Sequence, residues 1–239
     1  MTGEHTWEQF RRLFSLLGTA YDFGTWHWQP ETGPDYICVS AVLVQHTSWR
    51  NVERALDQLD AAGVCSLAAI GHLAEQELAS LIRPAGTQRM KARRLRSLAR
   101  LASEHNGLRS LLSLPADDLR PLLLATHGIG PETADAILLY AAGHAVFQID
   151  AYTVRIMRRL GLGPENDGYE DWQRWFQQAL PADVDAYRRA HALFVLHGKE
   201  RCRPQPRCDG CCLLEVCATG QERRGLSRTS RRASIPTRC

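Results

Sequence analysis

The chain has 239 residues, of which 44% are hydrophobic, and its 29 basic and 26 acidic residues give a formal net charge of +3. This length and composition exclude fibrous and intrinsically disordered proteins and allow one large core or two modest ones. Lys91 and Lys199 are the only lysines, so nearly all of the positive charge comes from arginine. Because arginine binds phosphate oxygens in a fork and does not act as a nucleophilic amine, this usage favours DNA contact and argues against Schiff-base chemistry.

The chain shows no secretory signal, and no uninterrupted apolar run reaches the roughly 18 residues of a membrane span. We therefore expect a soluble, cytoplasmic protein, associated with the nucleoid if its partner is DNA. We also expect a monomer that makes no membrane contact. In that compartment the eight cysteines are not expected to form disulfides.

Apolar residues recur at helical spacing along most of the chain, and no segment shows the period-two alternation of a strand. The predicted fold class is therefore all-α. The predicted helices, in chain order, are Thr6–Leu17, Asp35–His46, Ser48–Leu59, Ala68–Ile82, Gln88–His105, Asp117–Ala125, Glu132–Ala142, Ala151–Leu160, Tyr169–Leu180 and Asp183–Leu196.

The predicted helix at residues 88–105 follows a turn at residues 84–87 and carries a run of positive charge. Its basic residues are Arg89, Lys91, Arg93, Arg94, Arg96 and Arg100. A run of this kind is usually the solvated face of an amphipathic helix. Beside a glycine turn it can also lie along a phosphate backbone.

A glycine hairpin separates the helices predicted at residues 117–125 and 132–142. Gly128 and Gly130 flank Ile129, so the chain can turn tightly and bring backbone N–H groups close to a ligand. Pro131 then suits the first position of a helix, where its missing N–H has no intrahelical role. Unpaired N–H groups and the positive end of a helix dipole together predict an anion site, for which phosphate is the common ligand.

Asp150 stands between an apolar segment and the helix predicted to begin at Ala151. Aspartate at such a position is most often an N-cap, whose side chain accepts a hydrogen bond from the first turn. On the residues alone, a structural role is the more common one, and a catalytic role needs further support.

That support comes from a resemblance. The hairpin sequence and the isolated Asp about twenty residues later resemble the helix-hairpin-helix motif and catalytic Asp of the endonuclease III superfamily of DNA glycosylases. The resemblance implies that the hairpin holds the DNA backbone and that Asp150 assists cleavage of the bond between base and sugar. Bifunctional members carry a nucleophilic Lys two residues after the second Gly, where this chain has Glu132.

The same resemblance implies three further DNA-binding positions. Gln45 ends the predicted helix at residues 35–46 and matches a residue that fills the gap left by the extruded base. Without the resemblance, Gln45 would be read as a residue that caps or leaves its helix. Thr87 or Gln88 occupies the wedge position in the turn before the basic helix, although neither is bulky.

Cys202, Cys208, Cys211 and Cys217 crowd into sixteen residues with spacings of five, two and five. A zinc site usually has two separated short knuckles, so a 4Fe-4S cluster fits this pattern better. The arrangement resembles the C-terminal cluster loop of endonuclease III, whose first gap is one residue longer. Cys212 is a spare thiol that could replace Cys211.

These patterns predict two helical domains with Asp150 at the cleft between them. A six-helix barrel with the helix-hairpin-helix would span residues 35–145. The cluster domain would combine residues 1–34 with residues 146–217, and residues 218–239 would form a flexible basic tail.

The predicted function is a base excision DNA glycosylase that acts on double-stranded DNA and has little or no lyase activity. Its substrate could be an alkylated purine or an oxidised pyrimidine. The alternative is a catalytically weak helix-hairpin-helix protein that binds lesions or unusual DNA structures, because Glu132 could raise the pKa of a nearby Asp150.

Overall fold

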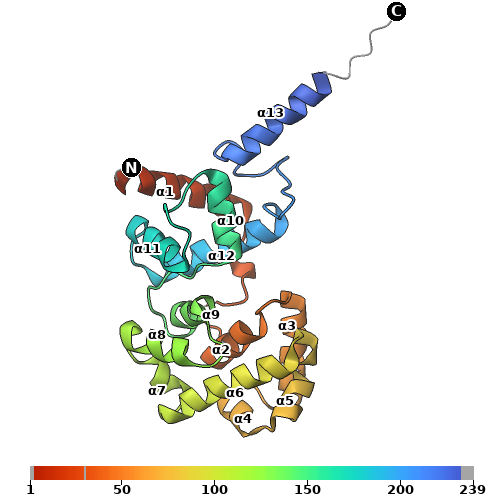
Figure 1. Ribbon diagram of the computed structural model, residues 1–239, viewed down its shortest axis with the longest axis vertical. Helices are drawn as coiled ribbons and strands as arrows, with labels where there is room; N and C mark the ends of the chain where they lie inside the picture. Colours follow the sequence, from red (N-terminus) through yellow and green to blue (C-terminus); the bar gives the residue numbers. More distant parts are fainter. Residues whose placement is uncertain (1–2, 30, 233–239) are drawn as a thin grey trace, which may run out of the picture. The chain divides into compact units, whose positions relative to one another are not determined.

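The computed structural model describes residues 3–29 and 31–232 (Figure 1). Regular structure within these ranges is entirely helical and includes no strand, which confirms the predicted all-α class. The chain forms two compact units. The first comprises the described parts of residues 1–26 and 149–239, and the second comprises those of residues 27–148. No helix in the described ranges is long and apolar enough to cross a membrane.

The boundary between the units falls after Trp26 rather than after residue 34. Trp28 explains this position, because its indole N–H donates a hydrogen bond of 2.8 Å to Ser40 Oγ. Its ring also packs against Trp49 and Tyr140 of the second unit, with centroids 6.2 and 5.0 Å apart. The chain therefore passes from the first unit to the second after Trp26, and the described residues from 27 onward fold with the second unit.

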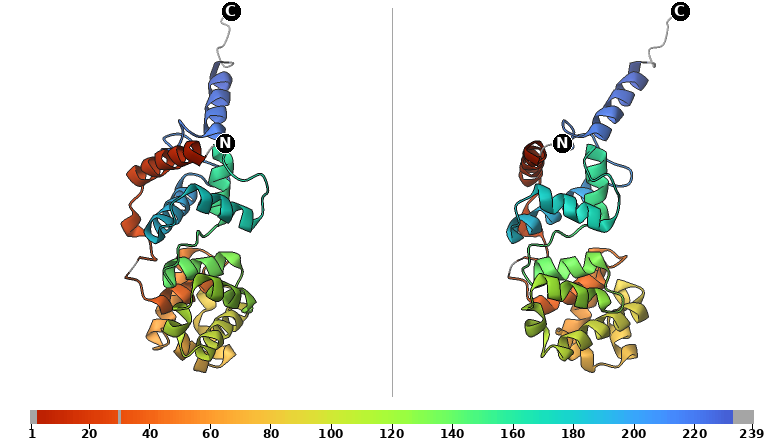
Figure 2. Two further views of the ribbon diagram at one scale, coloured as in Figure 1. Left: turned by 90° about the vertical axis from the view of Figure 1, so that its left-hand side faces the viewer. Right: turned by 60° about the vertical axis from the view of Figure 1, so that its left-hand side comes forward.

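The second unit is a helical bundle (Figures 1 and 2). Its helices are α2 (Pro34–Leu43), α3 (Trp49–Ala61), α4 (Leu67–His72), α5 (Glu75–Leu81), α6 (Gln88–Glu104), α7 (Leu108–Leu112), α8 (Ala116–Ala125) and α9 (Pro131–Ala136). A 3₁₀ turn η2 (Arg83–Ala85) precedes α6, and a π turn η3 (Ile137–Ala141) extends α9. The helix α2 is apolar and buried from Ile37 to Leu43, as expected of a central helix, and it packs against η3 and α6.

The segment predicted as one helix at residues 68–82 is two helices, α4 and α5. Leu73 and Ala74 separate them with extended backbone, at ψ 146° and 144°. The carbonyl of Leu73 has turned out of the helix and accepts a hydrogen bond from the Arg96 guanidinium of α6. The prediction failed because the apolar spacing continues across the break.

The first unit contains α1 (Gly3–Ala20), the 3₁₀ turn η1 (Phe23–Thr25), α10 (Ala151–Leu160), α11 (Tyr169–Ala179), α12 (Val184–Glu200) and α13 (Ala218–Arg232). The helix α12 packs against α1 and α10. Aromatic rings fill the core between α1, α11 and α12, with neighbouring centroids 5.2 to 5.9 Å apart. The contributing residues are Phe10, Phe14, Trp175, Phe176 and Phe194.

The helix α12 runs four residues beyond its predicted end at Leu196 and passes through Gly198. A Cβ atom at Gly198 would lie 2.4 Å from Tyr152 Cδ1. Gly198 therefore remains helical, and its missing side chain makes room for a ring from α10. The sequence prediction ended this helix two residues before Gly198, whose function here is close packing.

The basic tail differs from expectation, because residues 218–232 form the helix α13 where a flexible segment was predicted. Gln, Glu and Arg have good helix propensity, and this outweighs the two glycines of the segment. The last part of the predicted tail, including Cys239, lies outside the described residues.

Candidate functional site

Asp150 is the N-cap of α10 and is only 7% exposed. Its backbone is extended, at φ −129° and ψ 173°, and its Oδ1 accepts a hydrogen bond of 2.7 Å from the Thr153 amide. The structural role expected of an Asp at this position is therefore present. It also restrains the carboxylate, because one of its oxygens is held at the Thr153 amide.

The second oxygen of Asp150 faces His191 of α12. His191 Nε2 lies 3.6 Å from Asp150 Oδ2, and both side chains are buried. Burial favours the neutral carboxyl, but His191 and the Thr153 amide outweigh it and hold the pKa of Asp150 below its ordinary value. Asp150 is thus a buried carboxylate that stays ionised at neutral pH.

The expectation that Glu132 could raise the pKa of Asp150 stays a prediction. The groups that lower the pKa, His191 and Thr153, belong to the same unit as Asp150. Glu132 belongs to the other unit, where it is exposed in the first turn of α9. A carboxylate there interacts favourably with the positive end of the helix dipole, which is an ordinary structural role.

The predicted hairpin joins α8 to α9. Gly128 has φ +78°, whereas Gly130 has φ −91° and is the N-cap of α9 with Pro131 at the first helical position. The Ile129 side chain is buried, at 4% exposure, and its N–H donates to Thr126 O at 3.1 Å. Ile129 thus anchors the hairpin from inside. A DNA contact at this position would have to use its backbone.

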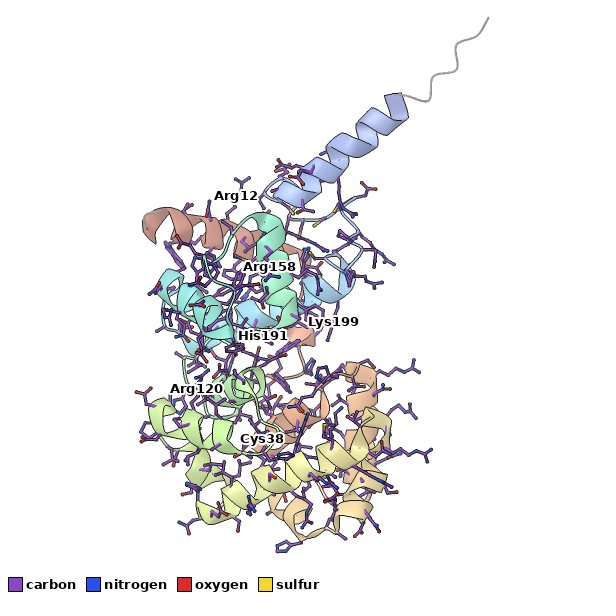
Figure 3. All side chains as sticks on the ribbon, in the orientation of Figure 1. Arg12, Cys38, Arg120, Arg158, His191 and Lys199 are labelled. Atoms are coloured by element: carbon purple, nitrogen blue, oxygen red, sulfur yellow. The ribbon has the colours of Figure 1, made fainter. Side chains whose placement is uncertain are left out.

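An ion pair ties the two helices of the hairpin together. Arg120 of α8 donates to both carboxylate oxygens of Asp135 in α9, at 2.7 and 3.1 Å (Figure 3). Asp135 is fully buried, and the two hydrogen bonds from the guanidinium compensate for the hydration that its carboxylate has lost. The pair sets the orientation of the first turn of α9, whose N–H groups have no intrahelical acceptors.

Gln45 is held by hydrogen bonds at both ends of its amide, to the hairpin through its nitrogen and to α6 through its oxygen. Its Nε2 donates to Thr133 Oγ1 at 2.9 Å and to Gly128 O at 3.3 Å. Its Oε1 accepts a hydrogen bond from Arg94 of α6. A Cβ atom at Gly128 would come within 2.3 Å of Arg94 Cγ, so this glycine is required by close approach as well as by its positive φ.

Thr87 and Gln88 lie at the start of α6, as predicted for the turn. Thr87 has φ 41° and ψ 38°, a left-handed conformation that a β-branched residue rarely adopts. His46, which follows Gln45, is also left-handed, at φ 54°. Backbone strain of this kind persists only where the surrounding structure holds it, and it often marks a functional segment.

Lys91 does not contribute to the basic face of α6. Its side chain is 1% exposed, and its Nζ donates to Leu43 O and Ala85 O at 2.8 Å each. Burial, with a smaller effect of Arg94, lowers the pKa of Lys91 to about 8. The expectation that Lys91 faces solvent or phosphate is wrong, because it satisfies two carbonyl groups inside the bundle.

Three other arginines of α6 and Arg109 of α7 border a groove with a volume of about 1010 Å³ in the second unit. Arg93, Arg96, Arg100 and Arg109 line it together with His127 of the hairpin loop. Glu75 partly balances the charge through an ion pair of 2.8 Å with Arg93. The groove thus extends positive charge from the hairpin along α6.

Four cysteines line one cavity of the first unit. They are Cys202, Cys208, Cys211 and Cys217, and the apolar residues Ile156, Leu160, Leu213 and Leu214 complete much of its wall. Cys212 is not among the lining residues. Within the described chain, no three His, Cys, Asp or Glu side chains converge as ligands of a single metal ion.

Two basic groups approach the sulfur atoms in this cavity. Arg159 of α10 donates to Cys202 Sγ at 3.2 Å, and His197 Nε2 lies 3.8 Å from Cys211 Sγ. A hydrogen bond from Cys212 and the His197 side chain lower the pKa of Cys211 to about 4. Burial instead raises the pKa of Cys208, so the four thiols do not ionise alike.

His191, His197 and Thr133 are the residues of this site that sequence reasoning missed. One signal was present: both histidines stand among apolar residues of a predicted amphipathic helix or directly after it. A buried imidazole requires a polar partner. Thr133 carried no such signal, since a Thr in the first turn of a helix is common.

Comparisons with known proteins agree with this geometry. Residues 39–182 match the family described as HhH-GPD superfamily base excision DNA repair protein. A candidate DNA repair glycosylase of Methanocaldococcus jannaschii is 37% identical over 217 residues, which span 90% of this chain and 98% of that protein. Endonuclease III of Sulfolobus acidocaldarius is 27% identical, over 79% of this chain and 88% of its own.

Two solved structures share the fold. An endonuclease III in a non-covalent DNA complex superposes with a TM-score of 0.76 at 22% identity, over 94% of this chain and 99% of that one. The 3-methyladenine DNA glycosylase of H. pylori, bound to 1,N6-ethenoadenine, gives a TM-score of 0.70 at 24% identity, over 82% and 97%.

Proposed function

Because the chain belongs to the HhH-GPD superfamily of base excision DNA repair proteins, we propose that it is a DNA glycosylase with Asp150 as its catalytic carboxylate. It cleaves the bond between a damaged base and its deoxyribose in duplex DNA. The observation that carries this assignment is the state of Asp150, which is buried, oriented and held ionised. As the bond breaks, positive charge develops on the sugar. A fixed anion in a site of low polarity stabilises that charge strongly.

In the proposed reaction the duplex bends and the damaged nucleotide leaves the base stack, as is required of enzymes that act on a base. The first turn of α9 and the hairpin backbone hold a phosphate. The arginines of the groove along α6 hold the flanking backbone. Asp150 then stabilises the cationic sugar or orients the attacking water.

Gln45 fills the gap left by the extruded base. Its hydrogen bonds to Thr133 and Gly128 keep its amide at the hairpin before DNA arrives. Because those partners belong to the phosphate-binding hairpin, contact of the hairpin with DNA and insertion of Gln45 are coupled. Thr87 or Gln88 acts as the wedge on the neighbouring turn, whose strained backbone supports this role.

The proposed enzyme is monofunctional, with little or no lyase activity. A lyase of this kind needs an amine that forms a Schiff base with the sugar, and Glu132 stands where bifunctional relatives carry that lysine. Lys91 is sealed inside the second unit by two carbonyl groups. Lys199 lies at the end of α12, where its ammonium is 6.0 Å from the centroid of the Trp26 ring.

We further propose that Cys202, Cys208, Cys211 and Cys217 hold a 4Fe-4S cluster. The four side chains line one cavity with apolar walls, as such a cluster requires. A mononuclear zinc site, in which all sulfurs bind the same ion at about 2.3 Å, usually has two separated short knuckles instead. In a cluster each thiolate binds a different iron, so the sulfurs stand farther apart. The cluster when bound would fix the loop after α12.

A panel of duplexes, each with one damaged base, tests the assignment and identifies the substrate. It should include alkylated purines and oxidised pyrimidines. Asp150→Asn should reduce excision to a small residual rate while DNA binding persists. Asp183→Asn is the matched control, because Asp183 caps α12 with a 2.7 Å bond to the Ala186 amide, as Asp150 caps α10. DNA binding without excision of any base, and no effect of Asp150→Asn, would favour a lesion-binding protein instead.

A further inference from the structure

His191 lies in the middle of α12, where Figure 3 labels it. Its neighbours Ala190, Ala192, Leu193 and Phe194 are all buried, and His191 itself is 2% exposed. An imidazole in such a place loses its hydration, so it lowers stability unless polar groups compensate. Its position therefore needs an explanation that packing alone does not give.

Two contacts define the orientation of the His191 ring. The Trp26 ring meets it edge-on, with centroids 5.6 Å apart and an interplanar angle of 80°. The second contact is to Asp150, whose Oδ2 lies 3.6 Å from His191 Nε2. This distance is long for a hydrogen bond, but such bonds often tighten only when the substrate is bound.

The two oxygens of Asp150 therefore have different neighbours. Oδ1 faces the Thr153 amide at 2.7 Å, and Oδ2 faces His191. The cap alone would hold one oxygen and leave the plane of the carboxylate free to turn about it. A second group on Oδ2 removes that freedom.

We propose that His191 is a positioning residue, which fixes the plane of the Asp150 carboxylate for its role in cleavage of the glycosidic bond. This inference rests on the proposed catalytic role of Asp150. His191 acts on the reaction through Asp150 and does not contact the base. The Trp26 ring, which packs edge-on against His191, helps to hold the imidazole in this orientation.

Replacement of His191 by Gln and by Asn separates this role from core packing. The Gln amide nitrogen takes the place of Nε2 and can still reach Oδ2, whereas the Asn amide takes the place of Nδ1 and cannot. Both variants are polar and smaller than His, so they disturb the core to a similar degree. His191→Leu is a third variant that keeps the apolar packing and removes every donor.

The measurement is single-turnover excision with saturating enzyme, together with the Kd for the same duplex and the melting temperature of each variant. We expect His191→Asn and His191→Leu to lower the maximal rate roughly ten- to hundredfold, the range for loss of a hydrogen bond to a charged group. The Kd should change less than about twofold, and His191→Gln should recover most of the rate. His144→Leu is the control, because His144 has a hydrogen-bond partner of its own, Leu114 O at 2.9 Å, and lies in the other unit.

The double variants with Asp150→Asn complete the test. If His191 acts through Asp150, His191→Leu should lower the residual rate of Asp150→Asn no further. Equal losses for Gln and Asn, an unchanged maximal rate in all variants, or a full additional loss in the Asp150→Asn background would each overturn the inference. Wild-type excision by Asp150→Asn would instead refute the catalytic role of Asp150, which is a separate result.

Discussion

The ammonium group of Lys91 lies 2.8 Å from the carbonyl of Leu43, a residue 48 positions earlier in the chain. A second bond of the same length reaches Ala85 O. Leu43 comes two residues before Gln45, and Ala85 comes two residues before Thr87. One buried lysine therefore joins the two segments that we expect to enter the DNA.

Lys91→Met should lower the stability of the second unit. It leaves two buried carbonyls without a donor, at a cost of about 1–3 kcal/mol each in the free energy of unfolding. Urea unfolding followed by tryptophan fluorescence measures this loss. Lys199→Met is the matched control, because Lys199 is the other lysine of the chain and is exposed. Equal stability of the two variants would contradict the role of Lys91 as a clamp.

The lowered pKa of Lys91 also predicts a pH dependence. Its pKa of about 8 in the folded state lies below the ordinary lysine value of 10.5, so the unfolded chain binds more protons between these pH values. Stability contributed by Lys91 therefore rises as pH increases from about 8 to 10.5. The free energy of unfolding of the wild type, relative to Lys91→Met at each pH, should increase over this range by up to about 3 kcal/mol. A flat difference would contradict the prediction.

Gly128 and Gly130 provide a matched pair in the hairpin. Gly128→Ala places a Cβ 2.3 Å from Arg94 Cγ at a positive φ, so it should displace Arg94 from Gln45. Gly130→Ala meets nothing within 4 Å and has a negative φ. We expect Gly128→Ala to lose about 1–3 kcal/mol of stability and to bind duplex DNA at least tenfold more weakly. Gly130→Ala should stay close to wild type in stability. Thermal unfolding measures both variants. Equal losses of stability in the two variants would count against the proposed Arg94–Gln45 arrangement.

The fold class could be predicted because it depends on local spacing of apolar residues, which survives in the sequence of each helix. The long helix at residue 88 and the helix after Asp150 began where their patterns indicated. The break at Leu73 could not be predicted, since it depends on Arg96 from another helix. The same is true of Gly198, whose role is set by the Tyr152 ring.

The candidate site shows the same division. A motif with fixed spacing identified Asp150, the hairpin glycines and the four cysteines as candidates. The state of each residue depends on partners that are distant in the chain. His191 lies 41 positions from Asp150, and its effect on the pKa could not be read from the residues around Asp150. Lys91 was misread for this reason, because a lysine in a basic run gives no local sign of burial.

The cluster proposal predicts a specific pattern among cysteine variants. Ser in place of Cys202, Cys208, Cys211 or Cys217 should reduce bound iron and the visible absorption of the purified protein. Cys212→Ser is the control and should retain both, because Cys212 does not line the cavity. Iron and sulfide analysis provides the measurement. Stoichiometric zinc without iron, or iron lost in Cys212→Ser and retained in Cys211→Ser, would contradict the ligand set.

Glu132→Lys should introduce lyase chemistry, since it restores the amine at the position of the bifunctional relatives. Glu132→Gln removes the charge without adding an amine and is the control. Borohydride trapping of an enzyme–DNA adduct should rise in the Lys variant alone. The stability cost should be small, about 0.3–1 kcal/mol, from a cation at the N-terminus of α9. No adduct in Glu132→Lys would show that this position does not reach the sugar.

The most direct measurement is strand cleavage at the excised site, on the best substrate of the panel, with and without alkali under single-turnover conditions. We predict that the base is released at the same rate in both arms, while the strand breaks only after alkali. Asp150→Asn should release base only at its small residual rate in both arms. Strand cleavage without alkali that keeps pace with base release, or a borohydride-trapped adduct of the wild-type protein, would contradict the account of a monofunctional glycosylase.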